Sequence, residues 1–469
     1  MTTSPDVSAD LTVDPPLKGV NLAEDWRVDS WSGLETLQQA RYPDQKALSE
    51  VLDRLSWLPP LVTSWEVLNL REQIAEAQAG KRFVLQGGDC AEHFDDCTGS
   101  LITNRLKVLL QMSLVLVHGL EMPVVRIGRF AGQYAKPRSS DTETRDGVTL
   151  PSYRGDLVNS VEFTEQGRIP DPQRLIQGHA CSSLTMNFVR ALVDGGFADL
   201  HHPEYWNLSW VEHSPLAEEF QRLADNIGHS VRFMETISGQ EPGSIRRVDF
   251  FTSHEALHLH YEQALTREVP RQWGWFNLST HFPWIGMRTA ALDGGHVEFF
   301  RGIRNPIGIK IGPGMTKEWL IGLLEVLNPE REAGRIVLIH RMGEDQIESH
   351  LPPLISAIKE AGSPVLWICD PMHGNTESIE SGIKTRRFRK IMNEVDLAFD
   401  VHADNGSRLG GVHLELTGED VTECTGGARN LSENDLQRAY KSSVDPRLNY
   451  EQSLELAMLI VRKHQQVTS

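Results

Sequence analysis

The chain has 469 residues, 40% of them hydrophobic, which is enough to bury a large core. Its 46 lysines and arginines are outnumbered by 64 aspartates and glutamates, so the formal net charge is −18. A surface this acidic repels phosphate backbones and argues against nucleic acid as a partner. An anionic ligand must therefore be held by a local cluster of basic side chains.

The sequence also argues against secretion and membrane insertion. Five cysteines in so long a chain do not make a disulfide framework, and the N-terminus has no basic start followed by an apolar block. The most apolar stretch, residues 109–125, is interrupted by polar side chains and is shorter than a membrane-spanning helix. We therefore expect a reduced, cytoplasmic protein with no membrane partner.

Residues 1–80 are predicted to form an extension in front of the main domain. Residues 1–17 are polar and rich in proline, which predicts disorder. Residues 47–55 have helical periodicity, and Pro59 and Pro60 end that pattern.

From residue 81 onward, short apolar runs alternate with amphipathic helical stretches. The runs occupy residues 83–85, 124–127, 248–251, 273–278, 307–311, 336–339, 365–369 and 412–416. Eight strands alternating with helices predict a (β/α)8 TIM barrel over residues 81–469, although a doubly wound sheet fits the same alternation. The connection between the second and third strands is far longer than one crossover helix needs. We expect a helical insertion there, at about residues 155–245, with helices near 173–193 and 215–234.

The fifth predicted strand places a lysine where an anion would bind. Ile307, Ile309 and Ile311 share one face, and Lys310 lies on the other face between two glycines. A structural lysine would extend to water from a strand end. A lysine in mid-strand with open space around it favours an anionic ligand.

Other strands end in polar side chains that suit a barrel active site. Glu415 lies on the polar face of the eighth strand and needs a cation, which can be a metal or a basic partner in a buried ion pair. Arg341, His373 and Cys90 follow the sixth, seventh and first strands at their carboxyl ends, where barrel active sites lie. A thiol, an imidazole and carboxylates are compatible with a divalent metal, but no local ligand spacing supports one. A cysteine taken alone is more often a small buried core residue.

Basic residues recur near the same strand ends. The stretch Lys136-Pro137-Arg138-Ser139 predicts a stiff anion-binding loop, because proline fixes the turn while cations and hydroxyls converge. The other basic candidates are Arg126, Arg129, Arg288, Lys310 and Arg341. Spacing alone therefore indicates a metal-dependent barrel enzyme that acts on phosphorylated small molecules.

A series of long motifs resembles the type II 3-deoxy-D-arabino-heptulosonate 7-phosphate (DAHP) synthases of plants and actinobacteria, from about residue 26 to residue 462. The motifs are LQGGDCAE (85–92), GQYAKPRS (132–139), SYRGD (152–156), TSHEAL (252–257), IGIKIGP (307–313), HRMG (340–343), DPMHGNT (370–376), GGVHLELTGEDVTEC (410–424) and DPRLN (445–449). The resemblance implies a (β/α)8 barrel. It also implies condensation of phosphoenolpyruvate with erythrose 4-phosphate, with release of phosphate, at the entry of the shikimate pathway.

The resemblance also implies roles for individual residues. One divalent metal, with Mn²⁺ favoured over Co²⁺, Fe²⁺ or Zn²⁺, would be bound by Cys90, His373, Glu415 and Asp445. Phosphoenolpyruvate would be bound by Arg129, Met287 (through its backbone amide), Arg288, Lys310 and Arg341, of which Arg129, Lys310 and Arg341 would be catalytic. The phosphate of the aldose would be held by Lys136, Arg138 and Ser139. A homodimer or homotetramer is expected, with chorismate mutase as a candidate partner.

Two residues depart from the family pattern. Met287 stands where the family motif WxGERTR has glutamate, which a backbone contact tolerates but a role for the glutamate side chain does not. Val444 stands where relatives often have cysteine, so a redox bridge from Cys90 to that position cannot form. Three alternative functions follow: a secondary-metabolism paralogue preferring an aminated aldose phosphate, a mainly binding or regulatory subunit, and a metal-dependent hydrolase. The hydrolase would not need two separate anion clusters.

Overall fold

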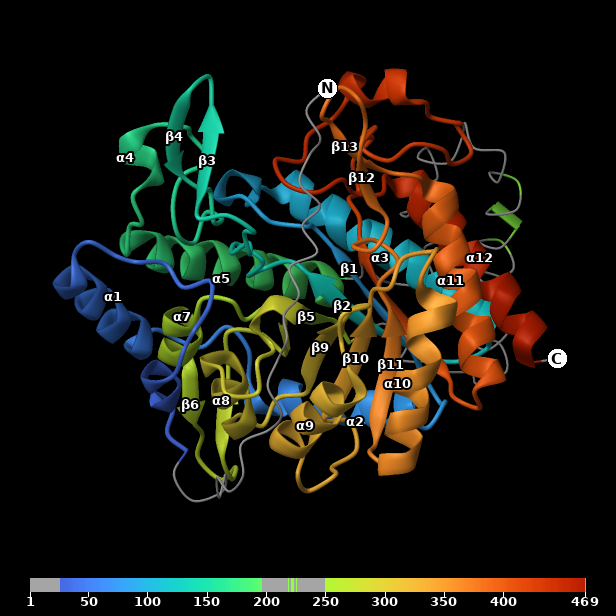
Figure 1. Cartoon of the computed structure of the whole chain (residues 1–469), viewed down its shortest axis with the longest axis horizontal. Helices are drawn as coiled ribbons and strands as arrows, with labels where there is room; N and C mark the ends of the chain where they lie inside the picture. The colour runs from blue at the N-terminus through green and yellow to red at the C-terminus, as the bar shows by residue number, and fades with distance from the viewer. Residues whose placement is uncertain (1–25, 196–217, 219–220, 223–224, 226–248, 469) are drawn as a thin grey trace.

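The computed structural model describes residues 26–195, 218, 221–222, 225 and 249–468, and these form a closed barrel of eight parallel strands (Figure 1). Around the barrel the strands follow the order β1, β14, β11, β10, β9, β8, β5 and β2. Their bounds are β1 Phe83–Gly88, β2 Val124–Arg129, β5 Phe251–Glu255, β8 Phe282–Ile285, β9 Ile307–Ile311, β10 Ile336–His340, β11 Val365–Cys369 and β14 Leu409–Glu415. The predicted barrel is confirmed, and the doubly wound sheet is wrong.

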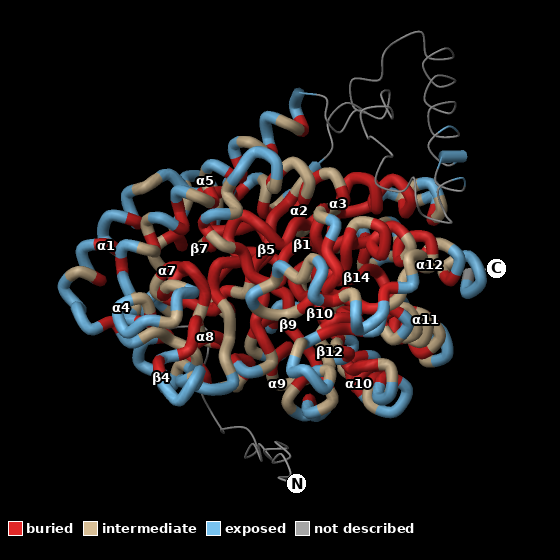
Figure 2. The backbone as a smooth tube through the Cα atoms, turned by 90° about the horizontal axis from the view of Figure 1, so that it is seen from above, coloured by how far each residue is buried: buried red, intermediate tan, exposed pale blue. Residues whose placement is uncertain are grey.

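Helices follow most of the strands and cover the outside of the barrel. They are α3 Gly99–Leu120, α7 Leu259–Ala264, α8 Gly295–Gly302, α9 Lys317–Leu327, α10 Ile347–Ala361, α11 Phe388–Asp404 and α12 Tyr450–Thr468. In Figure 2 the strands are buried, and these helices expose only their outer sides. This division follows from strand alternation, because one face of each strand packs on helices and the other points into the barrel.

The N-terminal segment contributes helices α1 Gln45–Trp57 and α2 Ser64–Gln78. Leu70, Ile74 and Ala77 of α2 join the small apolar cluster inside the barrel, together with residues such as Val84 and Val125 near the starts of their strands. Helix α2 therefore closes the amino-terminal end of the barrel and leaves the carboxyl-terminal end for ligands.

The long connection between β2 and β5 contains a hairpin of β3 Thr142–Arg145 and β4 Val148–Pro151, the short helix α4 Glu165–Arg168, and helix α5 Gln173–Asp194. Helix α5 agrees with the helix expected near 173–193. The helix expected near 215–234 and the disorder expected in residues 1–17 lie outside the described residues. The exact limits of the extension and of the insertion stay predictions.

The predicted fourth strand is wrong. Trp275–Asn277 is β7, which pairs with β6 Thr266–Glu268 in a separate two-stranded sheet outside the barrel. The barrel instead uses Phe282–Ile285, a four-residue strand that contains Pro283 and gives a weak strand signal. The third strand also lies later than predicted, at Phe251–Glu255.

Helix α3 contains residues 109–120 of the most apolar stretch of the sequence. It has 22 residues and, within the described part of the chain, is the one helix long and apolar enough to cross a membrane. However, 67% of its most apolar window is buried inside the protein, where it packs against β1, β2, α5 and α12. Such burial is typical of the core helix of a globular protein.

Candidate active site at the carboxyl end of the barrel

A cavity of about 860 Å³ opens at the carboxyl-terminal end of the barrel strands. It is lined by every site residue named from the sequence: Cys90, Arg129, Lys136, Arg138, Ser139, Met287, Arg288, Lys310, Arg341, His373, Glu415 and Asp445. These residues come from the ends of many strands and from the loops that follow them, so only closure of the barrel brings them together. Of the basic candidates, Arg126 does not line the cavity; it donates to Ser113 of helix α3, on the outside of β2.

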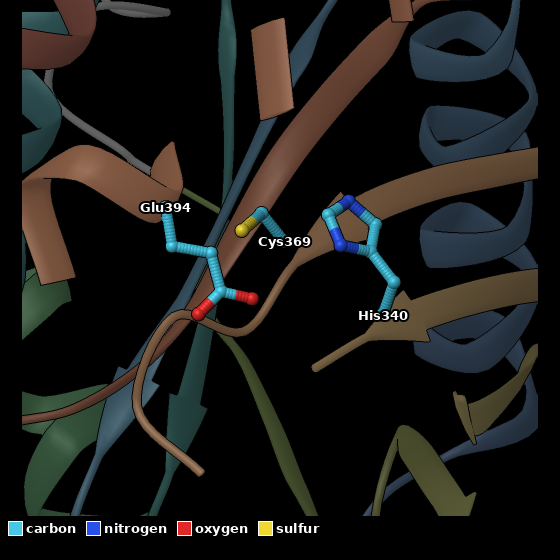
Figure 3. Close-up of side chains that lie close together, drawn as sticks. All are labelled: His340, Cys369 and Glu394. Atoms are coloured by element: carbon cyan, nitrogen blue, oxygen red, sulfur yellow. The ribbon is translucent and has the colours of Figure 1, made fainter. Parts of the chain in front are cut away.

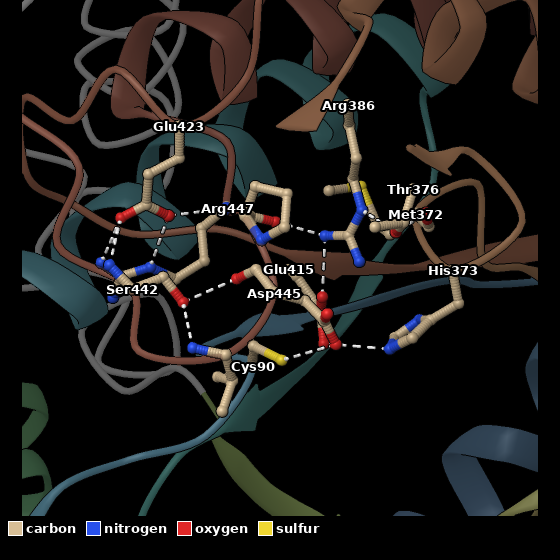
Figure 4. A network of polar contacts seen from close by, with 12 residues as sticks. Cys90, Met372, His373, Thr376, Arg386, Glu415, Glu423, Ser442, Asp445 and Arg447 are labelled. Atoms are coloured by element: carbon tan, nitrogen blue, oxygen red, sulfur yellow. Dashed lines mark hydrogen bonds and ion pairs between the residues drawn. The ribbon is translucent and has the colours of Figure 1, made fainter. Parts of the chain in front are cut away.

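Four metal-ligand types meet at one side of this cavity (Figure 4). The Cys90 thiol and an Asp445 carboxylate oxygen are 3.6 Å apart, and His373 Nε2 lies 3.1 Å from Glu415 Oε1. Ligand atoms of Cys90, Glu415 and Asp445 all lie within 4.8 Å of one another. One sulfur, one imidazole nitrogen and two carboxylates form a donor set that suits a first-row divalent metal.

The candidate metal donors Cys90 and Asp445 already bind a positively charged side chain. The Lys136 ammonium donates to Cys90 Sγ at 2.6 Å and to Asp445 Oδ2 at 2.7 Å. Burial raises the pKa of Asp445, but Lys136 and Arg386 together more than offset this effect and hold that pKa well below its usual range. Burial and the Glu415 carboxylate raise the pKa of the Cys90 thiol to about 12, and a divalent cation bound to sulfur would reverse that shift. The residues therefore fit a metal.

A second ring of contacts orients the donors. The His373 Nδ1 atom is 2.7 Å from Asp370 Oδ2, which leaves Nε2 facing the cavity side of Glu415. The buried Arg386 of β13 Lys384–Arg386 lies 2.8 Å from Glu415 Oε2 and also donates to the carbonyl of Pro446, next to Asp445. Arg386 thus connects two of the four donors.

The basic side chains form a second zone of the cavity. Arg129 donates to Glu415 Oε1 at 3.0 Å and contacts His413 Nε2 at 2.7 Å, while Lys310 is paired with Asp370. Both cations lie over the ring of Trp284, at 5.3 and 6.0 Å from its centre. Arg341 donates to the carbonyl of His373 at 3.1 Å, and its buried Nε has no hydrogen-bond partner among the described residues. An incoming anion would complete this arrangement.

Burial brings the pKa of one of these cations closer to neutral pH. It lowers the pKa of Lys310 to about 8, although the Asp370 carboxylate opposes the shift. The ammonium form is therefore held in place chiefly by Asp370, and a bound anion would stabilise it further.

Met287 begins a short 3-10 turn, Met287–Thr289, directly after β8. Its sulfur would lie 2.8 Å from a Cβ built on Gly312, and the Arg341 guanidinium would lie 3.2 Å from the same point. Met287 therefore occupies a slot over Gly312, beside Arg341. Glutamate at this position would place a carboxylate next to that arginine.

Glu255, Asp370 and Arg386 are among the residues at this site that had no role assigned from the sequence. Glu255, at the end of β5, lines the cavity, and burial raises its pKa even though cations surround it. Asp370 begins a predicted loop, and its position directly after a strand was a usable signal. Arg386 comes from a hairpin inside that loop, so its contact with Glu415 had no local signal.

A second group of possible metal donors lies behind the barrel wall (Figure 3). His340, Cys369 and Glu394 are all buried, and their ligand atoms lie within 4.8 Å of one another. His340 and Cys369 are on the strand faces that point toward helix α11, away from the cavity. This group is separate from the donors at the carboxyl end.

Comparisons with known proteins identify the family to which the chain belongs. The model of the class-II DAHP synthetase family matches residues 26–461. A "phospho-2-dehydro-3-deoxyheptonate aldolase" of Streptomyces coelicolor is 49% identical over 436 residues, covering 93% of this chain and 97% of that protein. A protein of the same name from Neurospora crassa is 46% identical over 460 residues, covering 95% of each chain.

A solved structure of a phospho-2-dehydro-3-deoxyheptonate aldolase from Francisella tularensis overlaps with a TM-score of 0.46 at 13% identity, covering 91% of this chain and 99% of that chain. The fold assignment depends on the barrel topology described above rather than on this overlap. Because the family model covers most of the chain and both relatives align over nearly their whole length, this chain belongs to the class-II DAHP synthetase family.

Proposed function

We propose that this protein is a DAHP synthase. It condenses phosphoenolpyruvate with erythrose 4-phosphate and water to give DAHP and inorganic phosphate, the entry step of the shikimate pathway. The observation that carries the proposal is the cavity itself, in which a cysteine–histidine–carboxylate donor set adjoins two groups of basic side chains. The names and high identity of the relatives support the same activity and do not favour the alternatives of a specialised paralogue or a binding subunit.

Phosphoenolpyruvate carries a carboxylate and a phosphate, and the deep basic residues suit both. Arg129, Lys310 and Arg341 would hold it against Trp284, and Arg288 with the backbone amide of Met287 would complete the clamp. Its enol carbon is a weak nucleophile, so the main contribution of these residues is placement of that carbon against the aldehyde. Bidentate arginine contacts supply the required orientation.

The aldose phosphate would bind at Arg138 and Ser139, on the loop after β2, with Lys136 between that loop and the metal donors. Bound in this way, the aldose would have its aldehyde end near Cys90 and its phosphate end near Lys136, Arg138 and Ser139. The substrate can therefore bridge the two zones of the cavity.

Cys90, His373, Glu415 and Asp445 would hold one divalent metal, for which we favour Mn²⁺. A metal at this position would polarise the aldehyde and stabilise the negative charge that develops on its oxygen. Asp370 fixes the His373 ring, and Arg386 balances the charge of Glu415. Buried Glu255 lies close enough to the basic zone to hold a water or a proton there.

The decisive experiment measures phosphate release with phosphoenolpyruvate and a panel of aldose phosphates, with and without a chelator. We expect turnover that requires erythrose 4-phosphate, is abolished by chelation and is restored by Mn²⁺. Full activity of exhaustively metal-stripped protein would refute the metal site, and phosphate release without an aldose would indicate a hydrolase. We also propose a cytoplasmic homodimer or homotetramer; a chorismate mutase partner stays a prediction from the resemblance.

A further inference from the structure

Two loops at the carboxyl end of the barrel carry residues that the proposed reaction needs. The loop after β10 begins with Arg341, and the loop after β11 contains His373. The two loops touch through their backbones: a Cβ on Gly374 would lie only 2.3 Å from the Gly343 nitrogen, and Gly343 has a φ of +87°. Their relative position therefore sets the distance between the phosphoenolpyruvate clamp and the metal donors.

The buried side chain of Glu394, on helix α11, hydrogen-bonds to both loops. Glu394 of helix α11 is fully buried, and its Oε1 accepts hydrogen bonds from the backbone amides of Met342 and Gly343 at 3.0 and 2.9 Å. Its Oε2 accepts from the Asn375 side chain at 2.7 Å. A single side chain thus binds the residues directly after Arg341 and a residue just after His373.

Asn375 completes the connection. Its side-chain nitrogen also donates to the carbonyl of Pro371, and its side-chain oxygen accepts from the amide of Glu344, in the other loop. Rotating the amide by half a turn would break both contacts, so the orientation of Asn375 is fixed. Only an acceptor can therefore face Asn375 from helix α11.

Nothing else in the surroundings explains a carboxylate here. Within the described residues, no lysine or arginine forms an ion pair with Glu394, and its near neighbours His340 and Cys369 supply no compensating charge (Figure 3). Burying a carboxylate without a cationic partner is costly unless several hydrogen bonds satisfy it. The three N–H donors from the two loops supply those hydrogen bonds and oppose the effect of burial, which still raises the pKa of Glu394 to about 8.

We propose that Glu394 is a positioning residue that holds the Arg341 loop and the His373 loop in register, so that phosphoenolpyruvate and the metal are bound at the correct separation. The proposal rests on the proposed function for the identity of these two ligands. Glu394 does not line the cavity, so it would touch neither ligand. It acts through the backbone on Arg341 and on His373, which are themselves joined by the 3.1 Å hydrogen bond from the Arg341 guanidinium to the His373 carbonyl.

The test measures binding rather than turnover alone. Mn²⁺ affinity of metal-stripped protein is determined by equilibrium dialysis, and phosphoenolpyruvate affinity by calorimetry, for wild type, Glu394→Gln, Glu394→Ala and Asn375→Ala. Glutamine keeps one acceptor for the two backbone amides but presents an N–H group to Asn375, so its effect should be intermediate. Glu394→Ala should weaken Mn²⁺ binding by about tenfold or more, in the range typical of residues that orient metal ligands.

Val395→Ala is the matched control. Val395 is the next residue of α11, is equally buried and belongs to the outer core, and its apolar side chain cannot hydrogen-bond to either loop. It should lower the thermal stability while leaving both affinities within twofold of wild type. If Glu394→Ala fails to fold, the affinities of Glu394→Gln and Asn375→Ala are compared with those of wild type instead.

The outcomes separate this proposal from the proposed function. Wild-type protein that binds neither Mn²⁺ nor phosphoenolpyruvate would refute the proposed function. Wild-type protein that binds both, with Glu394 and Asn375 variants that bind them equally well, would refute the positioning role alone. A loss of both affinities in these variants and not in Val395→Ala would support it.

Discussion

At the scale of single residues, the basic side chains of the cavity are held in place by buried partners. Lys310, Arg129 and Arg341 are conventional basic side chains, but each is held by a buried partner: Asp370, Glu415 or a backbone carbonyl. These partners fix the cations before substrate arrives, so binding does not have to order flexible side chains.

The lowered pKa of Lys310 predicts a pH dependence. Its ammonium form binds the anion, and burial places its pKa near 8, so kcat/KM for phosphoenolpyruvate should fall as the pH rises past about 8. The guanidinium of Lys310→Arg stays charged at all these pH values, so its kcat/KM should not fall in this range. Because a guanidinium differs in shape from an ammonium, the maximum kcat/KM of the variant will be lower. The measurement is a pH profile of kcat/KM for both proteins, and an alkaline limb at the same pH in both would assign that limb to another group.

Met287 allows a second prediction. A carboxylate in its slot would lie beside Arg341 and alter the field at the phosphoenolpyruvate site, whereas methionine only fills the volume. We expect wild type to make DAHP, and Met287→Glu to change the turnover number or the aldose preference. Steady-state kinetics with erythrose 4-phosphate and an aminated analogue provide the comparison, with Met287→Gln as the uncharged control. Identical constants in all three proteins would show that the departure from the family pattern is neutral.

At the scale of elements, both the strand ends and the loops that follow them supply the site residues. Lys310 and Glu415 are on strands, while Cys90, Lys136, His373 and Asp445 are on loops that follow strand ends. The opposite end of the barrel is closed by α2, whose apolar residues Leu70, Ile74 and Ala77 fill the lumen. Stability and ligand binding are therefore assigned to opposite ends of the same barrel.

The start of α2 is fixed by a capping box, which gives a prediction about stability. The Thr63 hydroxyl accepts from the Glu66 amide at 3.3 Å, and the Glu66 carboxylate accepts from the Thr63 amide at 2.8 Å. Thr63→Ala should lower the free energy of unfolding by about 0.5–2 kcal/mol. Thr63→Ser keeps the hydroxyl and should lose less. Chemical denaturation measures the difference, and an unchanged KM for phosphoenolpyruvate is expected because this helix lies at the far end of the barrel.

At the scale of the whole molecule, the metal donors join distant parts of the chain. Cys90 follows β1, Glu415 ends β14, which pairs with β1, and Asp445 lies beyond it, while His373 comes from the loop after β11. A cation bound by these four residues connects the first and last strands of the barrel. Only the folded state offers this site.

Metal binding should therefore stabilise the fold. A ligand present at about 100 times its Kd adds roughly 2.7 kcal/mol to the free energy of unfolding. We expect Mn²⁺ to raise the melting temperature of metal-stripped protein and a chelator to lower it again. Cys90→Ser should keep the fold and reduce the shift, because the thiol is lost as a ligand. An equal shift in Cys90→Ser and wild type would show that the stabilising ion binds elsewhere.

The sequence alone determined the alternation of strands and helices, the placement of Lys310 on the polar face of its strand and, through long motifs, the family with its barrel. These features are local, because strand alternation and motif order can be followed along the chain. The sequence pattern is weak where a strand is short. The strand Phe282–Ile285 has only four residues, one of them proline, whereas the aromatic residues of Trp275–Asn277 resemble a barrel strand but belong to an outer hairpin.

Only the tertiary structure decided how distant residues meet. Arg386 reaches Glu415 from a hairpin inside a loop, Glu394 reaches two loops from the outside of the barrel, and α2 fills the far end of the lumen. None of these contacts has a sequence period or a fixed spacing, since each depends on barrel closure bringing together segments that are far apart in the chain. The chemistry of each residue was therefore predictable from its type, and its partners were not.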